Sequence, residues 1–334
     1  MLEKNEIINC LLLLGDTVLM AVTDELQKQV NERISVAFEG EDDVIFSIDR
    51  NVEDRLLPVL EDKAAGLGGI ELVAEGIQQT RFTADDGNCR WKLIVDPIDG
   101  TRGIMYDKRS AFFLAGIAKN KGENTTLADI EYAVLLELPV SKSAYSDRFW
   151  AGRGQGWGAE RKKTLGEDAG TVMPLNAAPS RAKNLVGGFA QLSRFFPPGK
   201  GLLAGIEEEL MKKLLSERDI NRAIVFEDQY ISSGGQLYEL LCGHDRFTAE
   251  LRGLLAQYLK KSGIEFGLTC HPYDVCAHLI GEEAGVIITD EHGESLNAPF
   301  DTTTPVNWLG YANPDIHDTV WPELKKILVK EKLL

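Results

Sequence analysis

Two carboxylates, Asp96 and Asp99, follow the mostly apolar residues 91–95 and lie in the hexapeptide Asp-Pro-Ile-Asp-Gly-Thr at 96–101. A buried strand over 91–95 would deliver both carboxylates to its carboxyl end, and the proline between them stiffens the link. Hard cations such as Mg²⁺ take oxygen ligands, often one or two carboxylates together with a substrate phosphate. If a helix begins at Thr101, its free N–H groups point at the same place and can hold phosphate oxygens. The hexapeptide therefore predicts a site for metal-assisted phosphoryl chemistry.

The same hexapeptide also has a purely structural interpretation. Asp, Pro and Gly are common turn residues, so Asp96 and Asp99 could simply cap a turn. The complete hexapeptide after a buried strand favours the chemical interpretation. Residues 98–101 also resemble the Asp-x-Asp-Gly-Thr loop of haloacid-dehalogenase-type phosphatases, but Pro97 stands where that loop has its nucleophilic Asp. We therefore reject a covalent aspartate mechanism.

Composition narrows the classes of protein. The 334 residues suggest two domains or one large body in two parts. A net charge of −16 argues against a nucleic-acid-binding surface, which needs clustered Lys and Arg, but agrees with a site for divalent cations. The five cysteines include no C-x-x-C pair, so we expect no disulfide framework, no structural zinc and a cytoplasmic location. We expect no membrane partner, because no apolar run approaches the ~20 residues that span a bilayer and no signal peptide is recognisable.

Apolar periodicity predicts helices and strands along the whole chain. Asp49 stands ahead of an apolar pattern that begins at Val52, and it could cap that helix. The glycine-rich segment 152–158 lacks the G-x-G-x-x-G spacing of a dinucleotide loop and favours a hairpin. Helices are expected at 5–34, from 52 to just before Gly66, and at 236–241, 275–283 and 320–333, and strands at 44–48, 70–74, 91–95, 111–118, 130–136 and 286–289. The pattern alone indicates mixed α and β structure.

The hexapeptide at 96–101 resembles, at every position, the first signature of the inositol monophosphatase-like superfamily of metal-dependent, often lithium-sensitive phosphatases. That superfamily includes inositol monophosphatases, fructose-1,6-bisphosphatases and 3′-phosphoadenosine 5′-phosphate nucleotidases. Its upstream Glu is similar to Glu75, 21 residues before Asp96, and an earlier Asp is similar to Asp49. The order and spacing agree over residues ~50–120 and ~230–315.

The second signature of the superfamily is similar to Pro-Tyr-Asp-Val-Cys-Ala at 272–277, followed by Glu-Ala-Gly-Val at 283–286. Tyr273 replaces the usual Trp. Gly76 follows Glu75 where the family has a second Glu, and Arg102 follows the hexapeptide, which looks more like the nucleotidase branch than the inositol branch.

The resemblance implies a layered α/β/α/β/α sandwich. An α+β half at 1–150 would carry most of the metal ligands, and an α/β half at 151–334 would carry Asp274 and the loops that select the substrate. The active site would lie in the cleft between the halves. A homodimer is also implied by the family.

The resemblance further implies a role for each site residue. Glu75, Thr101 and Asp96 would be catalytic, with Glu75 and Thr101 orienting and activating the attacking water. The cofactors would be two or three Mg²⁺ ions. Their ligands would be Glu75, Asp96, Asp99, Asp274 and the carbonyl of Ile98, with Asp49 near an outer metal. Substrate contacts would come from Asp99, Gly100, Thr101, Ser233, Gly234 and Glu250.

The implied function is Mg²⁺-dependent hydrolysis of a small phosphate monoester, such as an inositol phosphate, a sugar phosphate or a 3′-phosphonucleotide. Some alternatives stay open. A degenerate member could bind a ligand or partner without turnover. Residues 232–235 could be a plain helix cap instead of a helix entry that faces substrate. His271 and His278, together with Asp274, could hold a transition metal, although no third soft ligand has a telling spacing.

Overall fold

The computed structural model describes residues 2–29, 36–39, 44–216, 219 and 222–334, with 36–39 and 44–51 described by their backbone alone. Asp49 falls in that last group. Its backbone lies in the first turn of helix α3 (Ser47–Leu67), so the helix begins two residues before Asp49 and not after it. The side chain of Asp49 lies outside the described residues, and its role at an outer metal stays a prediction.

The outermost layer at the N-terminal side consists of α1 (Glu6–Leu26) and α3. The side chain of Asn5 caps α1 by accepting a hydrogen bond from the N–H of Ile8. The apolar faces of the two helices pack on each other and on the first sheet, where they form one core. Part of the helix expected at 5–34 lies outside the described residues, and the described helix ends at Leu26.

Among the described residues, α1 is long and apolar enough to cross a membrane by length and composition alone. The expectation that no apolar run has this length is therefore wrong. A core helix satisfies the same criteria, and 56% of the apolar stretch of α1 is buried inside the protein. Its buried residues, such as Leu11, Leu14 and Val18, belong to the first core.

The second layer is an eight-stranded sheet in the order β10-β9-β8-β7-β6-β5-β3-β4. β3 and β5 run parallel, and the other neighbours are antiparallel. The strands are β3 (Ile70–Ala74), β4 (Ile77–Phe82), β5 (Trp91–Asp99), β6 (Ala111–Lys119), β7 (Ile130–Leu138), β8 (Tyr145–Gly152), β9 (Gly156–Lys163) and β10 (Val172–Pro174). A separate hairpin joins β1 (Val36–Glu39) to β2 (Val44–Phe46), and short helices follow β5 and β6: α4 (Thr101–Met105), η1 (Gly122–Asn124) and η2 (Leu127–Asp129).

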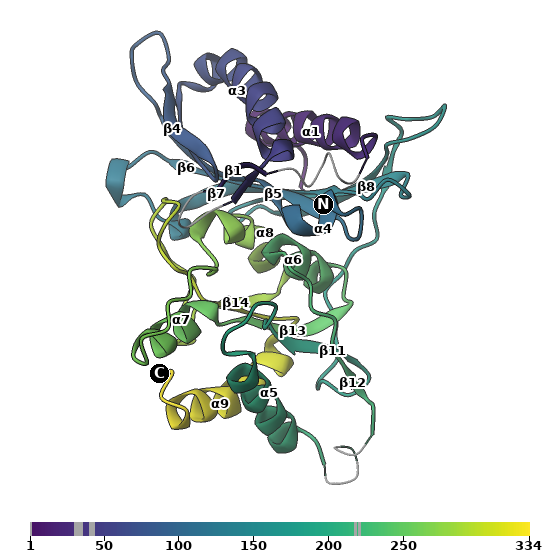
Figure 1. Ribbon diagram of the computed structural model, residues 1–334. Helices are drawn as coiled ribbons and strands as arrows, with labels where there is room; N and C mark the ends of the chain where they lie inside the picture. The colour runs from purple at the N-terminus through teal and green to yellow at the C-terminus, as the bar shows by residue number, and fades with distance from the viewer. Residues whose placement is uncertain (1, 30–35, 40–43, 217–218, 220–221) are drawn as a thin grey trace.

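The middle layer separates the two sheets (Figure 1). It contains α6 (Ser233–Leu241), α8 (His278–Ala284) and the short 3₁₀ helix η3 (Pro272–Val275). These elements pack on the first sheet with one face and on the second sheet with the other, which creates a second apolar core. The helix expected at 275–283 is therefore two elements, η3 and α8, with a break between them.

The fourth layer is a five-stranded sheet in the order β12-β11-β13-β15-β14, and helices on its far side form the fifth layer. A third apolar core lies between them. The strands are β11 (Gly188–Leu192), β12 (Val225–Phe226), β13 (Asp245–Glu250), β14 (Ile287–Thr289) and β15 (Trp308–Tyr311), and the helices are α5 (Lys200–Leu214), α7 (Arg252–Lys260) and α9 (Pro314–Lys330). The order of layers is α/β/α/β/α, as expected.

The glycine-rich segment 152–158 forms the expected hairpin, between β8 and β9. Both β9 and β10 pair within the first sheet, although they lie beyond residue 150, where the second half was expected to begin. The division of the chain into halves at that position stays a prediction.

Candidate metal centre

A β-bulge in β5 brings Asp96 and Asp99 to the same face of the first sheet. In a regular strand, residues three positions apart point to opposite faces, because side chains alternate. Here Asp96 pairs with Leu114 and Asp99 pairs with Phe112, so three steps along β5 match two along β6. Leu114 and Phe112 both belong to the middle core, and residues paired directly across two strands share a face. Both carboxylates therefore point toward the middle layer.

Glu75 reaches the same region from the neighbouring strand. β3 runs parallel to β5 with Ala74 paired to Val95, so the next residues of the two strands are Glu75 and Asp96. The N–H of Glu75 donates to the carbonyl of Val95 at 3.3 Å. Burial raises the pKa of Asp96, and the charge of the neighbouring Glu75 raises it further.

The third aspartate of the centre comes from the middle layer. Asp274 lies in η3, and its Oδ2 accepts a hydrogen bond from the N–H of His271 at 2.6 Å, which fixes the side chain. Carboxylate oxygens of Asp96, Asp99 and Asp274 all lie within 4.8 Å of one another. Two layers of the sandwich thus contribute to one cluster, which agrees with an active site between them.

The cluster is buried, and burial sets its electrostatics. Asp96 is 1% exposed, and burial together with the charges of Glu75, Asp99 and Asp274 raises its pKa well above the ordinary range. Burial raises the pKa of Asp274 to about 8, with a further contribution from the Asp99 charge. Burial also raises the pKa of Asp99 to about 6, although hydrogen bonds to the carboxylate oppose the shift. The protein therefore gathers carboxyl groups out of water, where their ionised forms are unfavourable, and the charge of Arg252 offsets only part of the effect of burial on Asp99 and Asp274.

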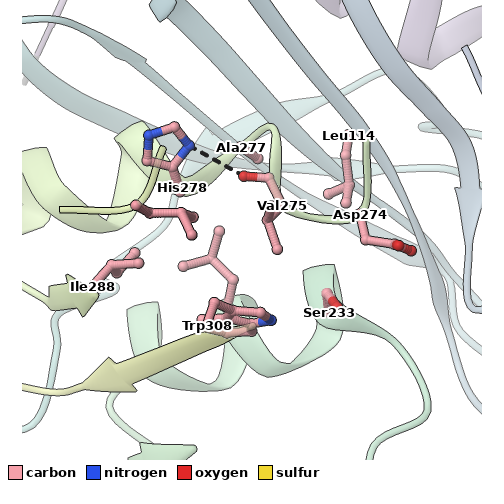
Figure 2. Close-up of a pocket in the computed structure, with 10 residues that line it drawn as sticks. Leu114, Ser233, Asp274, Val275, Ala277, His278, Ile288 and Trp308 are labelled. Atoms are coloured by element: carbon pink, nitrogen blue, oxygen red, sulfur yellow. Dashed lines mark hydrogen bonds between the residues drawn. The ribbon is translucent and has the colours of Figure 1, made fainter. Parts of the chain in front are cut away.

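A divalent cation fits this donor set. Mg²⁺ and similar hard cations bind carboxylate oxygens, and a doubly positive ion would favour the ionised forms that burial disfavours in all three carboxyl groups. Within the described part of the chain, no histidine or cysteine belongs to the cluster. His278 is buried in α8 and its Nδ1 lies 3.2 Å from the carbonyl oxygen of Val275 (Figure 2). The transition-metal interpretation with His271 and His278 is therefore not supported by the geometry.

The first turn of α6 holds Asp99 in place. Oδ2 of Asp99 accepts hydrogen bonds from the hydroxyl of Ser232 at 2.8 Å and from the N–H of Gly234 at 2.5 Å. The same hydroxyl accepts from the N–H of Gly235 at 2.8 Å and caps the helix. The two interpretations of residues 232–235 are thus linked, because one side chain caps α6 and also contacts a residue of the centre.

Ser232 belongs to the segment 232–235 that the sequence analysis considered as a helix cap or a helix entry that faces substrate, and it directly precedes the predicted Ser233 and Gly234. A Ser at an N-cap position is a usable signal for its capping role, but nothing in the sequence indicates that its hydroxyl also reaches Asp99. Ser233 is buried, and its hydroxyl oxygen lies 3.6 Å from the sulfur of Cys270. The contacts of Ser233 and Gly234 with substrate stay predictions.

The end of the hexapeptide makes a tight turn. Gly100 has φ +97°, a left-handed conformation that favours glycine, and the helix α4 starts at the next residue. The hydroxyl of Thr101 donates to the carbonyl oxygen of Ile98 at 2.8 Å. Thr101 and the Ile98 carbonyl, predicted to act at the water and the metal respectively, are therefore neighbours.

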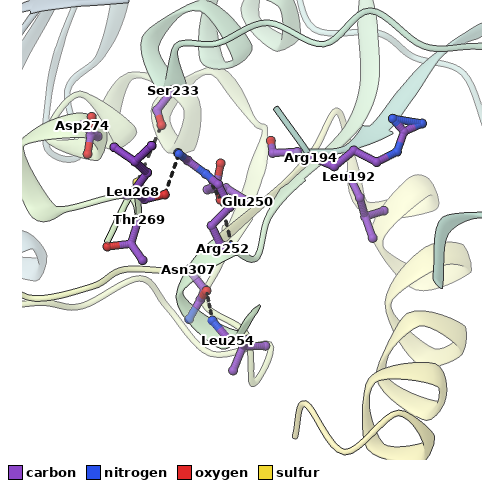
Figure 3. Close-up of polar contacts among 12 residues, drawn as sticks. Leu192, Arg194, Ser233, Glu250, Arg252, Leu254, Leu268, Thr269, Asp274 and Asn307 are labelled. Atoms are coloured by element: carbon purple, nitrogen blue, oxygen red, sulfur yellow. Dashed lines mark hydrogen bonds and ion pairs between the residues drawn. The ribbon is translucent and has the colours of Figure 1, made fainter. Parts of the chain in front are cut away.

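Glu250, which is predicted to contact substrate, is buried and pairs with an arginine. Its side chain is fully buried in β13, and Oε1 accepts a hydrogen bond from Nε of Arg252 at 2.8 Å. Arg252 in turn donates to the carbonyl oxygen of Leu268 at 2.9 Å, and Figure 3 shows this group beside Ser233 and Asp274. A direct contact of Glu250 with substrate stays a prediction, and Arg252 is a residue that the sequence analysis missed.

Tyr273, which replaces the usual Trp, adds a hydroxyl next to the centre. The hydroxyl donates to Oε1 of Glu75 at 3.5 Å and lies 3.2 Å from Nδ1 of His271. The ring of His271 stacks on that of Tyr273, with centroids 5.4 Å apart. The substitution thus retains an aromatic side chain and gives Glu75 a polar neighbour.

Sequence comparisons give no relatives: no family model and no curated protein matches the chain. Solved structures do match. The extragenic suppressor protein suhB of Bartonella henselae superposes with a TM-score of 0.63 at 18% identity, over 96% of this chain and 99% of that one. Fructose-1,6-bisphosphatase of Leishmania major superposes with a TM-score of 0.64 at 11% identity, over 96% and 94%. The chain has the fold of inositol monophosphatases and fructose-1,6-bisphosphatases.

An IMPase of Thermotoga maritima adds a further match, with a TM-score of 0.56 at 15% identity over 96% of this chain and 98% of that one. This inositol monophosphatase fold accounts for nearly the whole chain, so the resemblance seen in the sequence is confirmed at the level of the fold. At such low identities the likeness does not establish an activity. The activity has to be argued from the carboxylate cluster, which could hold a metal ion.

The raised pKa values predict that Mg²⁺ stabilises the protein more at pH 8 than at pH 6. The pKa values of Asp99 and Asp274 lie above their ordinary 3.8, so the stability they contribute to the metal-free protein is present below that value and lost as pH rises through about 6 and about 8. Mg²⁺ binds the ionised carboxylates, so the stability that it restores is largest at high pH, where these carboxyl groups have lost their protons. Thermal unfolding with and without Mg²⁺, at equal ionic strength, checks this. A larger rise in Tm at pH 6 than at pH 8 would contradict it.

Proposed function

We propose that the protein is a Mg²⁺-dependent phosphatase that hydrolyses a small phosphate monoester. The observation that carries this proposal is the buried cluster of Asp96, Asp99 and Asp274, with oxygens within 4.8 Å of one another at the end of a bulged strand. The cluster lies beside the turn at Gly100 where a helix begins. The fold, which this chain has in common with structures described as an IMPase and a fructose-1,6-bisphosphatase, supports the same chemistry.

The residues that would hold Mg²⁺ are those whose oxygens face the cluster. Asp96, Asp99 and Asp274 provide carboxylates, with Glu75 and the carbonyl of Ile98 at the edge, and we propose two or three ions. When bound, the ions would supply Lewis-acid stabilisation of the phosphate oxygens and lower the pKa of a coordinated water. We keep Asp49 as a proposed residue near an outer metal.

Thr101 and Glu75 have the chemistry needed to handle the proton of the attacking water. The Thr101 hydroxyl donates to the carbonyl oxygen of Ile98, so its oxygen lone pairs remain able to accept from the water. Glu75 is half-buried at the end of β3, and its carboxylate can accept the same proton directly. No side chain is required as a nucleophile in this scheme, because water attacks phosphorus in line.

The start of α4 would bind the phosphate group. The first N–H groups of a helix have no intrahelical acceptor, and those of Gly100 and Thr101 are next to Asp99 in the chain. They would donate to the oxygens of the phosphate and hold it against the carboxylate cluster. The substrate would be an inositol phosphate, a sugar phosphate or a 3′-phosphonucleotide, hydrolysed in the cytoplasm by a homodimer.

The test is phosphate release by the full chain with Mg²⁺ from a panel of substrates. The panel would contain inositol 1-phosphate, fructose 1,6-bisphosphate, 3′-phosphoadenosine 5′-phosphate and 4-nitrophenyl phosphate. We expect turnover of at least one of them, with the preferred compound identifying the substrate class. Folded protein that releases phosphate from none of them would contradict the proposal and favour a binding protein that has lost turnover.

A further inference from the structure

Arg109 connects α4 and α6, the two helices that border the carboxylate cluster. It lies in the turn after α4, where its N–H donates to the carbonyl oxygen of Gly103 at 3.4 Å. Its side chain reaches the segment 227–232, which leads into α6. There Nη1 donates to Oδ1 of Asp228 at 2.8 Å, and the guanidinium carbon lies 3.8 Å from the ring centre of Tyr230, a cation–π contact. We call Arg109, Asp228 and Tyr230 the brace, because together they hold the chain that enters α6 against the turn that follows α4.

The ring of Tyr230 is fixed from several sides. Its hydroxyl donates to the carbonyl oxygen of Ser110 at 2.9 Å, and the residue is buried. The ring also packs edge to face on Phe112, with centroids 6.0 Å apart. Phe112 is the residue that pairs with Asp99 across β5 and β6. Tyr230 therefore contacts both the turn after α4 and the strand pair that carries the cluster.

The brace also lies against the first turn of α6, which holds Asp99. A Cβ at Gly235 would lie 2.7 Å from Cε1 of Tyr230, so this turn and the ring are in direct contact. Ser232 follows Tyr230 by two positions in the chain. Its hydroxyl and the N–H of Gly234 both donate to Oδ2 of Asp99. A displacement of Tyr230 would therefore reach both hydrogen bonds that orient this carboxylate.

The contacts of Arg109 indicate a local role and not a large share of the stability. Its side chain is 31% exposed and that of Asp228 is 57% exposed, and ion pairs that face water contribute little to folding. A second carboxylate, that of Glu239 in the last turn of α6, lies 3.7 Å from Nη2. Arg109 thus contacts the chain just before α6 and also the far end of that helix. Its loss should loosen α6 without unfolding the protein.

We propose that Arg109 is a positioning residue for the metal centre. Through the brace it fixes the first turn of α6, and through that turn it sets the orientation of the Asp99 carboxylate. The proposal rests on the proposed function and adds to it a residue that contacts neither the substrate nor a metal ion. Partners that hydrogen-bond a metal ligand change metal affinity or activity by about 10–100-fold when they are replaced. Because Arg109 acts one contact further away, we expect effects at the lower end of that range.

Arg109→Gln removes both the ion pair and the stacked guanidinium group, and it is the variant that tests the proposal. Calorimetric titration should show Mg²⁺ affinity weakened by about tenfold. At saturating Mg²⁺, kcat for the preferred substrate should fall about tenfold while KM changes by less than about twofold, because the brace touches no part of the substrate. Tm should stay close to that of wild type. An Arg109→Gln protein with wild-type Mg²⁺ affinity and kcat would overturn the proposal.

Two further variants divide the brace into its parts, and a third is the control. Arg109→Lys keeps a positive charge for Asp228 but has no planar group to stack on Tyr230, so it should recover only part of the lost Mg²⁺ affinity. Asp228→Asn keeps the stacked pair and should show a smaller loss than Arg109→Gln. The control is Arg90→Gln, at the opposite end of β5 from the cluster, because the Arg90 side chain is 67% exposed and lies 3.6 Å from Asp86. It should match wild type in every measurement.

Hydrogen exchange of the metal-free protein separates this inference from the proposed function. In Arg109→Gln the backbone amides of residues 232–236 should exchange about tenfold faster than in wild type, whereas those of α5 and of the first sheet should keep their rates. If the wild-type protein releases no phosphate, the proposed function fails, and the exchange rates together with Mg²⁺ binding still decide the inference. Wild-type exchange rates at 232–236, or an increase spread evenly over the whole protein, would overturn it even if hydrolysis is observed.

Discussion

Replacement of Asp96 by Asn should reduce Mg²⁺-dependent phosphate release by about a thousandfold or more, while the metal-free protein becomes as stable as wild type or more stable. A metal site supplies several kcal/mol of transition-state stabilisation, and about 4 kcal/mol corresponds to a thousandfold in rate. Burial and three neighbouring carboxylates raise the pKa of Asp96, so its ionised form is unfavourable in the metal-free protein. Asn resembles the protonated form, and its side-chain oxygen can still accept the 3.0 Å hydrogen bond from the N–H of Ile98.

The matched control is Asp168→Asn, because the Asp168 side chain is 73% exposed and its ion pair within the described part of the chain is with Lys163 at 3.1 Å. It should leave both activity and Tm close to those of wild type. The measurements are phosphate release in Mg²⁺ and thermal unfolding in EDTA, both at pH 8. An Asp96→Asn protein that keeps most of its activity would contradict a role of Asp96 at the metal. A large loss of stability of this variant in EDTA would contradict our view that the charge of Asp96 destabilises the metal-free protein.

Replacement of Gly234 by Ala should lower both stability and activity. A Cβ at this position would lie 2.7 Å from Cδ2 of Leu114, 2.9 Å from Oδ2 of Asp99 and 3.0 Å from Cβ of Phe112. Overpacking of this kind costs about 1–3 kcal/mol, and the gain of about 1 kcal/mol in helix propensity from Gly to Ala offsets only part of it. Any shift of α6 also moves the N–H that binds Asp99. We expect activity to fall about tenfold or more, because small displacements of catalytic groups are costly.

Gly205→Ala is the matched control for Gly234→Ala, and here the same substitution should stabilise the protein. Gly205 lies in α5, is exposed, and has open space where a Cβ would be. Its replacement should raise stability by about 0.5–1 kcal/mol and leave activity unchanged. Thermal unfolding and phosphate release of both variants decide the matter. Equal effects of the two substitutions would show that the close approach of α6 to Asp99 and Phe112 is unimportant.

The carboxylates of the centre could be predicted from the sequence because local signals are strong there. A strand followed by the hexapeptide 96–101 indicates two carboxylates at a strand end, whereas Glu75, at the end of a second strand that pairs in parallel with it, was assigned to the site through the resemblance. The bulge that brings Asp96 and Asp99 to one face could not be predicted, because it depends on the register between β5 and β6. Asp274 could be assigned to the centre only because the residues around it resemble the second signature of the superfamily.

Residues that act through tertiary contacts were harder to predict. Ser232 could be recognised as a helix cap, but its bond to Asp99 crosses from the middle layer to the first sheet. Arg252 stands at the start of α7, in a segment whose approach to Phe196 is set by the packing of distant elements. Glu250 was assigned to substrate by resemblance, and its complete burial beneath Arg252 was not visible in the sequence.

Element boundaries were least predictable where the chain changes layers. The strand expected to end near 95 extends to Asp99, because pairing with β6 resumes at Asp99 after the bulge at residues 97 and 98. The helix expected at 275–283 divides into η3 and α8, which allows Asp274 to be held by the N–H of His271 at the start of a short turn. Apolar periodicity could not separate these two elements, since both bury the same kind of residue in the middle core.

Removal and return of Mg²⁺ is the measurement that tests our central claim most directly. The protein would be stripped with EDTA, dialysed, and titrated with Mg²⁺ while phosphate release from its preferred substrate is followed. We predict no release without the ion, restoration that saturates as Mg²⁺ is added, and no restoration in Asp96→Asn. Phosphate release that continues at the same rate in the stripped protein would contradict a metal-dependent phosphatase at Asp96, Asp99 and Asp274.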